Sequence, residues 1–258
     1  MPNFNRYTQT ALRAAEAGGK ILLKYFNKKI PIYFKKKFDP VTVADRSAQS
    51  AVIRNIRRKF PKHSFLAEED NALSCDARNC WVIDPLDGTI NFIHKIPLFC
   101  VSVAFRKNGE VIAGVIHCPV LKETFVAEKG KGAYLNGKKI RVSTISSLDK
   151  SIVVTGFPYE RSRIKRVVRN LHSVLGLTQG VRRLGSAAMD LAYVACGRLD
   201  AFWEEGLNPW DSAAGALIVI EAGGRVTDYD GERDFEKKRH ILASNGILHK
   251  KMLKLISA

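Results

Sequence analysis

The stretch that decides the fold is Trp81-Val82-Ile83-Asp84-Pro85-Leu86-Asp87-Gly88-Thr89. Its three leading apolar residues predict a short buried strand that ends at Asp84. Pro85 favours a turn, Asp87 follows three residues after Asp84, and Gly88 permits a close approach of the backbone. Two carboxylates that project from one turn repel each other unless a cation lies between them. The stretch therefore predicts a divalent-cation site, and Mg²⁺ is the cation that prefers such oxygen ligands.

Further acidic residues occur where other predicted elements begin or end. Asp45 opens a helix, Asp211 opens an apolar helix, and Glu68-Glu69-Asp70 follows a Phe-Leu-Ala run. An Asp-Pro-x-Asp-Gly turn taken alone is more often a solvated turn. In a chain with a formal net charge of +17, acids gathered at element junctions favour the metal-site interpretation.

Gly88 and Thr89 follow the acidic turn and are predicted to open a helix. The free N–H groups at a helix start bind anions, so these two residues are candidates for holding a phosphate group. Thr89 is equally compatible with an ordinary N-cap, and both roles can hold together.

Outward from this stretch, the pattern predicts two N-terminal helices followed by an antiparallel meander. The first helix carries an apolar stripe from Ala11 to Tyr25, and the second runs from Asp45 to Lys59. The basic segment 30–39 between them is predicted to be a strand or a loop. Asn108-Gly109 and Asn136-Gly137 are hairpin signals. The expected strands of the meander are Phe99–Phe105, Val111–His117 and Thr124–Ala127.

The last hundred residues alternate between helical and strand patterns. Strands are predicted at 152–155, 201–204, 225–227 and 241–243, and helices at 187–195, 211–221 and the C-terminus. A basic helix after residue 160 is expected to turn Ile164, Val167, Val168 and Leu171 inward. Strands and helices in this order predict layered α+β packing.

The composition is that of an ordinary globular protein. With 258 residues and 46% hydrophobic residues, we expect a single domain of two packed lobes, about 1–148 for the metal site and about 149–258 for the substrate side. The longest apolar run, 213–220, is far shorter than the roughly 20 residues of a membrane span. The N-terminus lacks the apolar core of a signal peptide, so a cytoplasmic location is expected.

Three motifs, in this order and spacing, resemble those of the inositol monophosphatase family. They are Ala67-Glu68-Glu69, the stretch from Trp81 to Phe92, and Asn208-Pro209-Trp210-Asp211-Ser212-Ala213-Ala214-Gly215. The resemblance runs from about residue 8 to the C-terminus. The segment from Arg182 to Ala195 is similar to that of a bacterial subgroup of the family, often called SuhB. The resemblance implies an αβαβα sandwich and Mg²⁺-dependent, lithium-sensitive hydrolysis of inositol monophosphate or a similar polyol phosphate by a homodimer.

The resemblance also assigns roles to individual residues. As metal ligands it implies Glu68, Asp84, the Leu86 carbonyl, Asp87 and Asp211. As catalytic residues it implies Glu68, which orients the attacking water, and Thr89 with Asp45, which polarise it. As substrate-binding residues it implies Asp87, Gly88, Thr89, Gly185, Ser186, Ala187, Glu204 and Asp211. The loop Lys35-Lys36-Lys37-Phe38-Asp39-Pro40 departs from the family's pattern and leaves open which lysine faces the metal site.

Alternative functions remain open at this point. The same motifs serve phosphatases of histidinol phosphate, fructose bisphosphate or nucleotide 3′-phosphates. The SuhB subgroup includes members that act in transcription antitermination, so an RNA, RNA polymerase or Nus-factor partner is the second hypothesis. The net charge of +17 and the arginine-rich segment 161–169 are compatible with it, although a solvated helix face explains that segment equally well.

Overall fold

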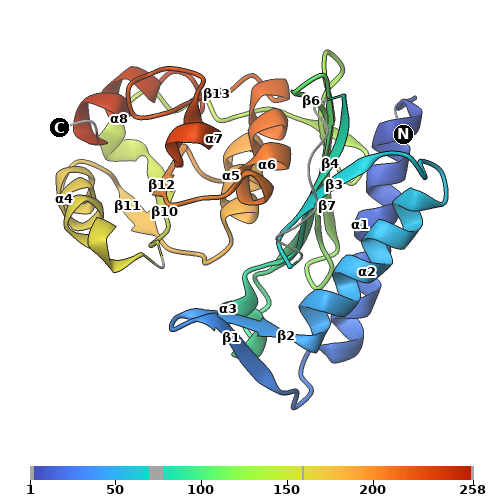
Figure 1. Cartoon of the computed structure of the whole chain (residues 1–258). Coiled ribbons are helices and arrows are strands. Elements are labelled where there is room, and N and C mark those ends of the chain that lie inside the picture. The colour runs from blue at the N-terminus through green and yellow to red at the C-terminus, as the bar shows by residue number, and fades with distance from the viewer. Residues whose placement is uncertain (1–2, 70–77, 159, 257–258) are drawn as a thin grey trace.

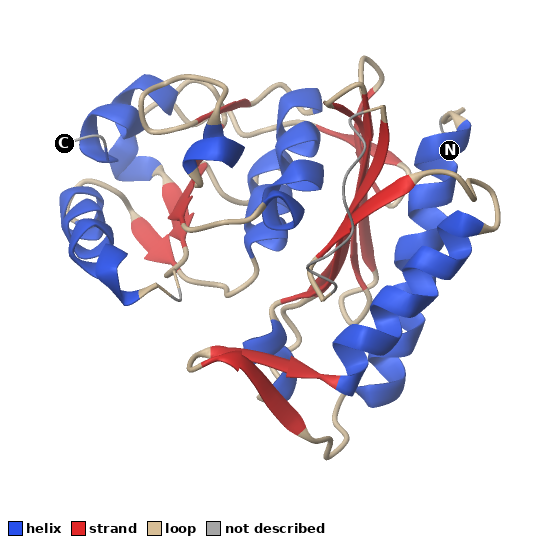
Figure 2. Cartoon of the chain, in the orientation of Figure 1, coloured by secondary structure: helices blue, strands red, loops and turns tan. Residues whose placement is uncertain are grey.

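The computed structural model describes residues 3–69, 78–158 and 160–256. Within them the chain forms alternating layers: two helices, a seven-stranded sheet, two helices, a five-stranded sheet, and a final helical layer (Figure 1). Figure 2 shows the same alternation of helices and strands across the molecule. The expected αβαβα arrangement is confirmed. Asp70, the last acid of the run after the Phe-Leu-Ala segment, lies outside the described residues.

The first layer consists of α1 (Arg6–Tyr25) and α2 (Val43–Arg57). The Asn5 side chain caps α1 by accepting hydrogen bonds from the backbone N–H groups of Tyr7 and Thr8. Thr42 and Asp45 form a capping box at the start of α2, so Asp45 is buried at the third position of the helix. The chain segment that connects the two helices forms a separate antiparallel hairpin of β1 (Ile32–Lys36) and β2 (Asp39–Thr42) (Figure 1).

The seven-stranded sheet has the order β3-β4-β5-β6-β7-β8-β9. The hairpin turns at Asn108-Gly109 and Asn136-Gly137 both have positive φ at their two central residues, as type I′ turns require. The meander expected from the sequence is confirmed. The strands are β3 (Ser64–Ala67), β4 (Asn79–Asp87), β5 (Cys100–Lys107), β6 (Glu110–Cys118), β7 (Glu123–Glu128), β8 (Gly132–Leu135) and β9 (Lys138–Ile140).

The strand β4 is longer than the sequence pattern predicts. It does not end at Asp84 but continues through Pro85 to Asp87, with a register irregularity against β5 between the two aspartates. Pro85 has no N–H to donate, so it interrupts the hydrogen-bond ladder without ending the extended backbone. The short helix α3 (Thr89–Ile93) follows directly.

The central layer holds α5 (Ala187–Ala195) and α6 (Pro209–Glu221), which pack between the two sheets. Both are nearly all apolar, as expected of helices covered on two faces. Glycines allow the close packing: a Cβ on Gly114 of β6 would lie 2.9 Å from the Ala214 carbonyl oxygen. A Cβ on Gly215 would lie 2.6 Å from Leu191 of α5. α6 is therefore held firmly between the sheet and α5.

The five-stranded sheet has the order β11-β10-β12-β14-β13 and is covered on its outer face by α4 (Ile164–Leu175) and α8 (His249–Ile256). Its strands are β10 (Ile152–Thr155), β11 (Gly180–Arg182), β12 (Ala201–Glu205), β13 (Arg225–Thr227) and β14 (His240–Ser244). Short helical turns lie at η1 (Leu148–Lys150), η2 (Arg161–Arg163) and α7 (Phe235–Lys238).

One expected core residue of α4 is wrong. Val168 is 56% exposed, whereas Val167 and Val174 are buried. Leu171 packs against the core cluster that contains Val174. The buried stripe advances by three and four residues from Val167, and Val168 lies one residue, about 100°, away from it.

As for membrane association, none of the helices in the described residues has the length and apolarity needed to cross a bilayer.

His249 joins three elements at the end of the second sheet. Its Nδ1 lies 2.8 Å from the Ser244 hydroxyl of β14, and its Nε2 lies 2.9 Å from the Thr227 hydroxyl of β13. Burial, and then the positive charge of Arg225, lower the pKa of His249 to about 4. The folded protein therefore keeps this imidazole neutral where an unfolded chain, with an ordinary His pKa near 6.5, already binds a proton.

We expect this buried histidine to make the fold acid-sensitive. As the pH falls from about 7 to about 4, the unfolded chain gains a proton at His249 that the folded chain does not, so stability falls through this window. The His249→Asn variant should show a shallower fall of the melting temperature over the same range. Melting temperatures measured at several pH values test this, and parallel curves for the two proteins would contradict it.

Candidate active site

The site is centred on the end of β4 and the start of α3. Asp84 is 2% exposed, and its Oδ1 accepts a hydrogen bond from the Leu86 N–H at 3.0 Å. Gly88 follows Asp87 with φ of 100°, and a Cβ there would lie 2.9 Å from the Leu98 carbonyl oxygen. Only glycine fits this left-handed position without strain. The tight passage from strand to helix places the side chains of Asp84, Asp87 and Thr89 on the same cavity.

The remaining predicted metal ligands come to the same cavity from other elements. β3 runs parallel to β4 with Ala67 opposite Ile83, so Glu68 emerges beside Asp84. Asp211 lies in the first turn of α6, where its Oδ2 accepts from the Asn208 N–H at 2.7 Å. The structure thus brings all five predicted metal-binding residues, including Leu86, to one cavity.

Asp87 is held by the first turn of α5. Its Oδ2 accepts hydrogen bonds from the Ser186 hydroxyl at 2.7 Å and from the Ala188 N–H at 2.6 Å. Ser186 is also the N-cap of α5, since its side chain accepts from the Met189 N–H. The contact joins the end of β4 to the helix that the sequence assigned to the substrate side.

The gathered carboxylates strongly perturb one another. Burial, and then repulsion from Glu68, Asp87 and Asp211, raise the pKa of Asp84 well above its usual value. Burial, and then the negative charges of Glu68 and Asp87, raise the pKa of Asp211 well above its usual value as well. Burial raises the pKa of Glu68 to about 7, although the Lys35 ammonium opposes the shift. Such a cluster of like charges is typical of a functional site that binds a cation.

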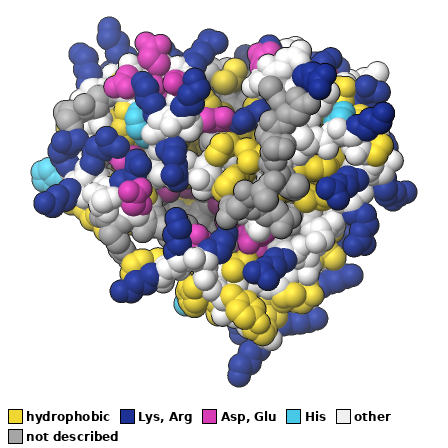
Figure 3. All heavy atoms as spheres, in the orientation of Figure 1, with side chains coloured by type: hydrophobic (Ala, Val, Ile, Leu, Met, Phe, Trp, Pro, Cys, Tyr) yellow, Lys and Arg dark blue, Asp and Glu magenta, His cyan; other side chains and the backbone are white. Residues whose placement is uncertain are grey.

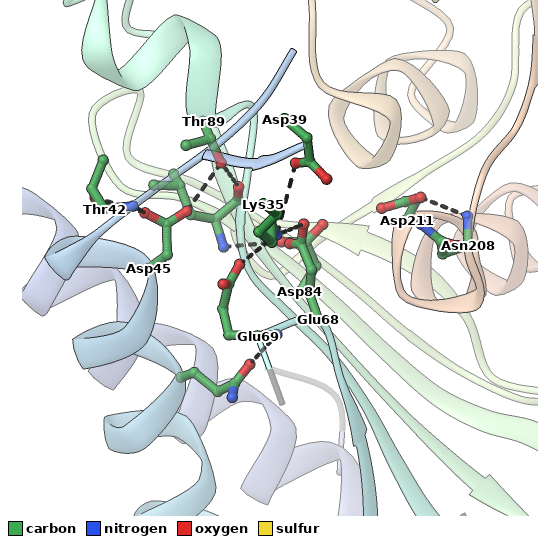
Figure 4. Close-up of polar contacts among 12 residues, drawn as sticks. Lys35, Asp39, Thr42, Asp45, Glu68, Glu69, Asp84, Thr89, Asn208 and Asp211 are labelled. Carbon is green, nitrogen blue, oxygen red and sulfur yellow. Dashed lines mark hydrogen bonds and ion pairs between the residues drawn. The ribbon is translucent and has the colours of Figure 1, made fainter. Parts of the chain in front are cut away.

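Lys35 from the β1–β2 hairpin places a positive charge beside these acids. Its Nζ lies 2.7 Å from Glu68 Oε1, 2.9 Å from Glu69 Oε1 and 3.9 Å from Asp39 Oδ1. Burial opposes ionisation, but the charges and hydrogen bonds of Glu68 and Glu69 raise the pKa of Lys35. Figure 4 shows Lys35 pointing at Glu68 and Glu69, with Asp211 facing them from α6. The lysine that the sequence left undetermined is therefore Lys35.

Thr89 lines the same cavity and contacts Asp45 of α2, which is fully buried (Figure 4). The Thr89 hydroxyl lies 3.0 Å from Asp45 Oδ1 and 3.0 Å from the Leu86 carbonyl oxygen. The other oxygen of Asp45 accepts from the Thr42 N–H and hydroxyl at 2.8 and 2.6 Å. Burial raises the pKa of Asp45, and the hydrogen bonds from Thr42 and Thr89 reduce that shift. The expected Thr89–Asp45 pair is present.

The donor set suits a divalent cation. Carboxylates and one backbone carbonyl are hard oxygen ligands, which Mg²⁺ and similar cations prefer. Several of these carboxylates accept hydrogen bonds from protein groups. In the ranges 3–69, 78–158 and 160–256, no group of three His, Cys, Asp or Glu side chains is arranged to hold a metal ion. Asp87 and Asp211 each use one carboxylate oxygen, Oδ2, in the hydrogen bonds described above.

Four of the predicted substrate-binding residues line the far wall of the same cavity. Gly185, Ser186 and Ala187 form the entry to α5, and Glu204 projects from β12. A Cβ on Gly156 would lie 2.1 Å from both carboxylate oxygens of Glu204. The Glu204 carboxylate therefore rests directly on the backbone of Gly156. Burial raises the pKa of Glu204 to about 8, against the effect of Arg183.

Four residues of this region were missed as site residues from the sequence. Lys35 was one of three adjacent lysines, and Asp190 and Arg183 line the cavity but entered the sequence analysis only within the segment from Arg182 to Ala195, with no role of their own. Arg239, which lies in a basic segment without a recognisable motif, donates to the carbonyl oxygens of Gly206 and Leu207 at 2.6 and 3.1 Å. Arg239 thus fixes the loop between β12, which carries Glu204, and α6, which carries Asp211.

Comparison with known proteins agrees with this geometry. Residues 4–258 match the inositol monophosphatase family. The chain is 44% identical to an inositol-1-monophosphatase of Synechocystis over 257 residues, covering 98% of this chain and 89% of that protein. It is 42% identical to a Pseudomonas aeruginosa protein named Nus factor SuhB, covering 95% and 94% of the two chains.

Solved structures give the same relationship. The crystal structure of the extragenic suppressor protein SuhB from Bartonella henselae superposes with a TM-score of 0.94 at 38% identity, covering 98% of each chain. The inositol monophosphatase from Anabaena superposes with a TM-score of 0.88 at 42% identity, covering 96% of this chain and 94% of that one. The chain therefore belongs to the inositol monophosphatase family, whose members are metal-dependent phosphatases that act on phosphate monoesters.

Proposed function

We propose that this phosphatase hydrolyses inositol monophosphate, or a similar small polyol phosphate, with the help of Mg²⁺. The observation that carries the proposal is the single cavity that unites Glu68 after β3 and the two aspartates of β4 with Asp211 of α6 and Glu204 of β12. One side of it is rich in carboxylates that a cation would neutralise. The other side presents a carboxylate and the start of α5, groups that form hydrogen bonds with hydroxyls.

The proposed metal ligands are Glu68, Asp84, the Leu86 carbonyl, Asp87 and Asp211. Bound Mg²⁺ would lower the pKa of a water molecule and neutralise charge that develops on the phosphate. Asp45, fixed by Thr42, orients the Thr89 hydroxyl, and this pair can accept the proton of the attacking water. Glu68 would orient the same water. No nucleophilic side chain is required, because phosphoryl transfer depends mainly on positioning and charge stabilisation.

The phosphate would lie at Gly88 and Thr89. The first N–H groups of α3 have no acceptor within the helix, which begins directly after the left-handed Gly88. On the alcohol side, Gly185, Ser186, Ala187 and Glu204 would contact hydroxyl groups. Homodimer formation, lithium sensitivity and a cytoplasmic location are further predictions from the resemblance.

Phosphate release from a panel of esters tests this function. The panel includes inositol 1-phosphate, histidinol phosphate, fructose 1,6-bisphosphate and a nucleoside 3′-phosphate, each with Mg²⁺ and with a chelator. We expect Mg²⁺-dependent release that is fastest with inositol 1-phosphate. A faster reaction with another ester would reassign the substrate, and no release from any ester would overturn the proposal.

The substitution Gly156→Ala tests the proposed role of Glu204 in binding the substrate's hydroxyl groups. The three heavy atoms nearest to the new methyl group all belong to the flexible end of Glu204, so the fold should persist while the carboxylate is displaced. Loss of a charged hydrogen bond costs about 1.5–3 kcal/mol, so we expect kcat/KM for inositol 1-phosphate to fall about 10- to 100-fold. Gly176→Ala is the matched control, since a Cβ there meets nothing within 4 Å. Equal activities of the two variants would remove Glu204 from this role.

A second candidate function is participation in transcription complexes. Two observations favour it: the relative named Nus factor SuhB, and the net charge of +17. Figure 3 shows lysine and arginine side chains spread over much of one face. Binding to RNA is expected to weaken steeply with added salt if these residues contact phosphates. No binding to RNA, RNA polymerase or Nus factors at low salt would exclude this function.

A further inference from the structure

Asp190 is a buried carboxyl group that the proposed mechanism does not use. It lies in α5 and is 1% exposed. In the described part of the chain, its Oδ1 is fully buried and has no hydrogen-bond partner. Leaving a buried polar group unpaired costs about 1–3 kcal/mol, so such a group needs an explanation.

The position of Asp190 points to the substrate cavity. It lies four residues, about one helical turn, after Ser186, whose hydroxyl holds Asp87. Asp190 lines the same cavity as Glu204 and Arg183. The cavity is therefore where the free oxygen of Asp190 can find a partner.

The charged groups around Asp190 do not satisfy it. Burial, and then repulsion from Glu204 and Asp87, raise the pKa of Asp190 well above its usual value, while Arg183 has a smaller opposite effect. Arg183 does not bond the Asp190 Oδ1, which has no hydrogen-bond partner in the described residues. The Arg183 guanidinium instead lies 5.8 Å from the centre of the Phe157 ring. A purely structural carboxyl would be expected to have such a partner.

We propose that Asp190 is a specificity-determining residue that binds a hydroxyl group of the substrate's alcohol, next to Glu204. This inference rests on the proposed phosphatase function and deepens it. A hydroxyl both donates and accepts hydrogen bonds, so it can pair with the carboxyl in either protonation state. A second phosphate placed here would face two acidic side chains. The substrate class is therefore the monophosphates of neutral polyols rather than sugar bisphosphates.

Two substitutions and two substrates test the inference. Asp190→Ala removes the hydrogen-bonding group, whereas Asp190→Asn keeps one. The substrates are inositol 1-phosphate and p-nitrophenyl phosphate, whose alcohol has no further hydroxyl. The control is Asp149→Asn, at an exposed position on η1. Steady-state kinetics and melting temperatures are measured for every protein.

For Asp190→Ala we expect kcat/KM for inositol 1-phosphate to fall about 10- to 100-fold, mainly through KM, as for a lost hydrogen bond to a charged group. The same variant should hydrolyse p-nitrophenyl phosphate within about threefold of the wild type, with an unchanged or higher melting temperature. Asp190→Asn should recover most of the lost kcat/KM. This combination would support hydroxyl binding.

An equal loss with both substrates, or a lower melting temperature with no change in substrate preference, would show a structural role and overturn the inference. Unchanged kinetics in Asp190→Ala would overturn it as well. Wild-type turnover of p-nitrophenyl phosphate distinguishes a failure of this inference from a failure of the proposed function. If the wild type hydrolyses neither ester, the proposed function fails and this inference with it.

Discussion

The substitution Asp84→Asn is expected to reduce phosphate release at least about a thousandfold. Asp84 lies at the centre of the carboxylate cluster, and the asparagine keeps its shape and its acceptor for the Leu86 N–H while removing the negative charge. Metal ions supply several kcal/mol of transition-state stabilisation, and each 1.36 kcal/mol is tenfold in rate. Phosphate release at saturating inositol 1-phosphate and Mg²⁺ measures the effect.

The same substitution is expected to stabilise the metal-free protein. Burial and three neighbouring carboxylates raise the pKa of Asp84, so the fold disfavours its charged form. Removing that charge should raise the melting temperature in chelator by about 2–4 °C for each kcal/mol gained. The exposed control Asp149→Asn should change neither property. A variant that retains activity, or that melts lower than the wild type in chelator, would contradict the assignment of Asp84.

The second large effect is expected for Thr89→Ala. Its hydroxyl is the only group of this side chain that bonds Asp45 and the Leu86 carbonyl, and general-base positioning contributes about 10²- to 10⁴-fold to a rate. We therefore expect kcat to fall by about that factor while KM changes little. The measurement is the kinetics of phosphate release under the same conditions as for the wild type.

Thr89→Ser is the matched control for this prediction. Serine keeps the hydroxyl and loses only a methyl group, so it should retain most of the activity. Comparable losses in Ala and Ser would indicate that packing of the methyl group, rather than the hydroxyl, matters at Thr89. Comparable activity of Thr89→Ala and the wild type would remove the Thr89–Asp45 pair from the mechanism.

Much of the fold could be predicted from local patterns. Alternating apolar residues and the two Asn-Gly turns predicted the meander, because hairpin turns of this type require positive φ at both positions. Acids at the ends of strands and starts of helices predicted the site, because such junctions meet at the edges of packed layers. Asp45 and Asp211 occupy equivalent capping positions in α2 and α6, which is visible in the sequence as an acid three residues after the N-cap.

The rest depended on contacts between distant segments. Which of the three lysines at 35–37 faces Glu68 is set by the register of the β1–β2 hairpin, and β1 is exposed along its whole length. Gly156 follows β10, and its importance depends on Glu204 of β12, which packs on it from a distant part of the sequence. Asp190 is a single acid in an apolar helix, and no local pattern reveals that it lines the cavity with a buried oxygen that has no hydrogen-bond partner in the described residues.

The arrangement also shows how function limits stability here. Asp84 is almost fully buried beside the carboxylates of Glu68, Asp87 and Asp211, with Lys35 as a counter-charge for Glu68 and Glu69. Like charges held together destabilise the fold unless a cation is bound, and a ligand that binds only the folded state stabilises it. We therefore expect divalent cations to stabilise the protein even without substrate.

The central claim is that the carboxylate cluster holds divalent metal ions, and anomalous X-ray diffraction from crystals soaked in Mn²⁺ tests it most directly. We expect anomalous peaks in the cavity within coordination distance of Asp84, shared with Glu68, Asp87 and Asp211, and weaker or absent in Asp84→Asn crystals. A cavity without any anomalous peak at saturating Mn²⁺, with Lys35 still paired to Glu68 and Glu69, would contradict it.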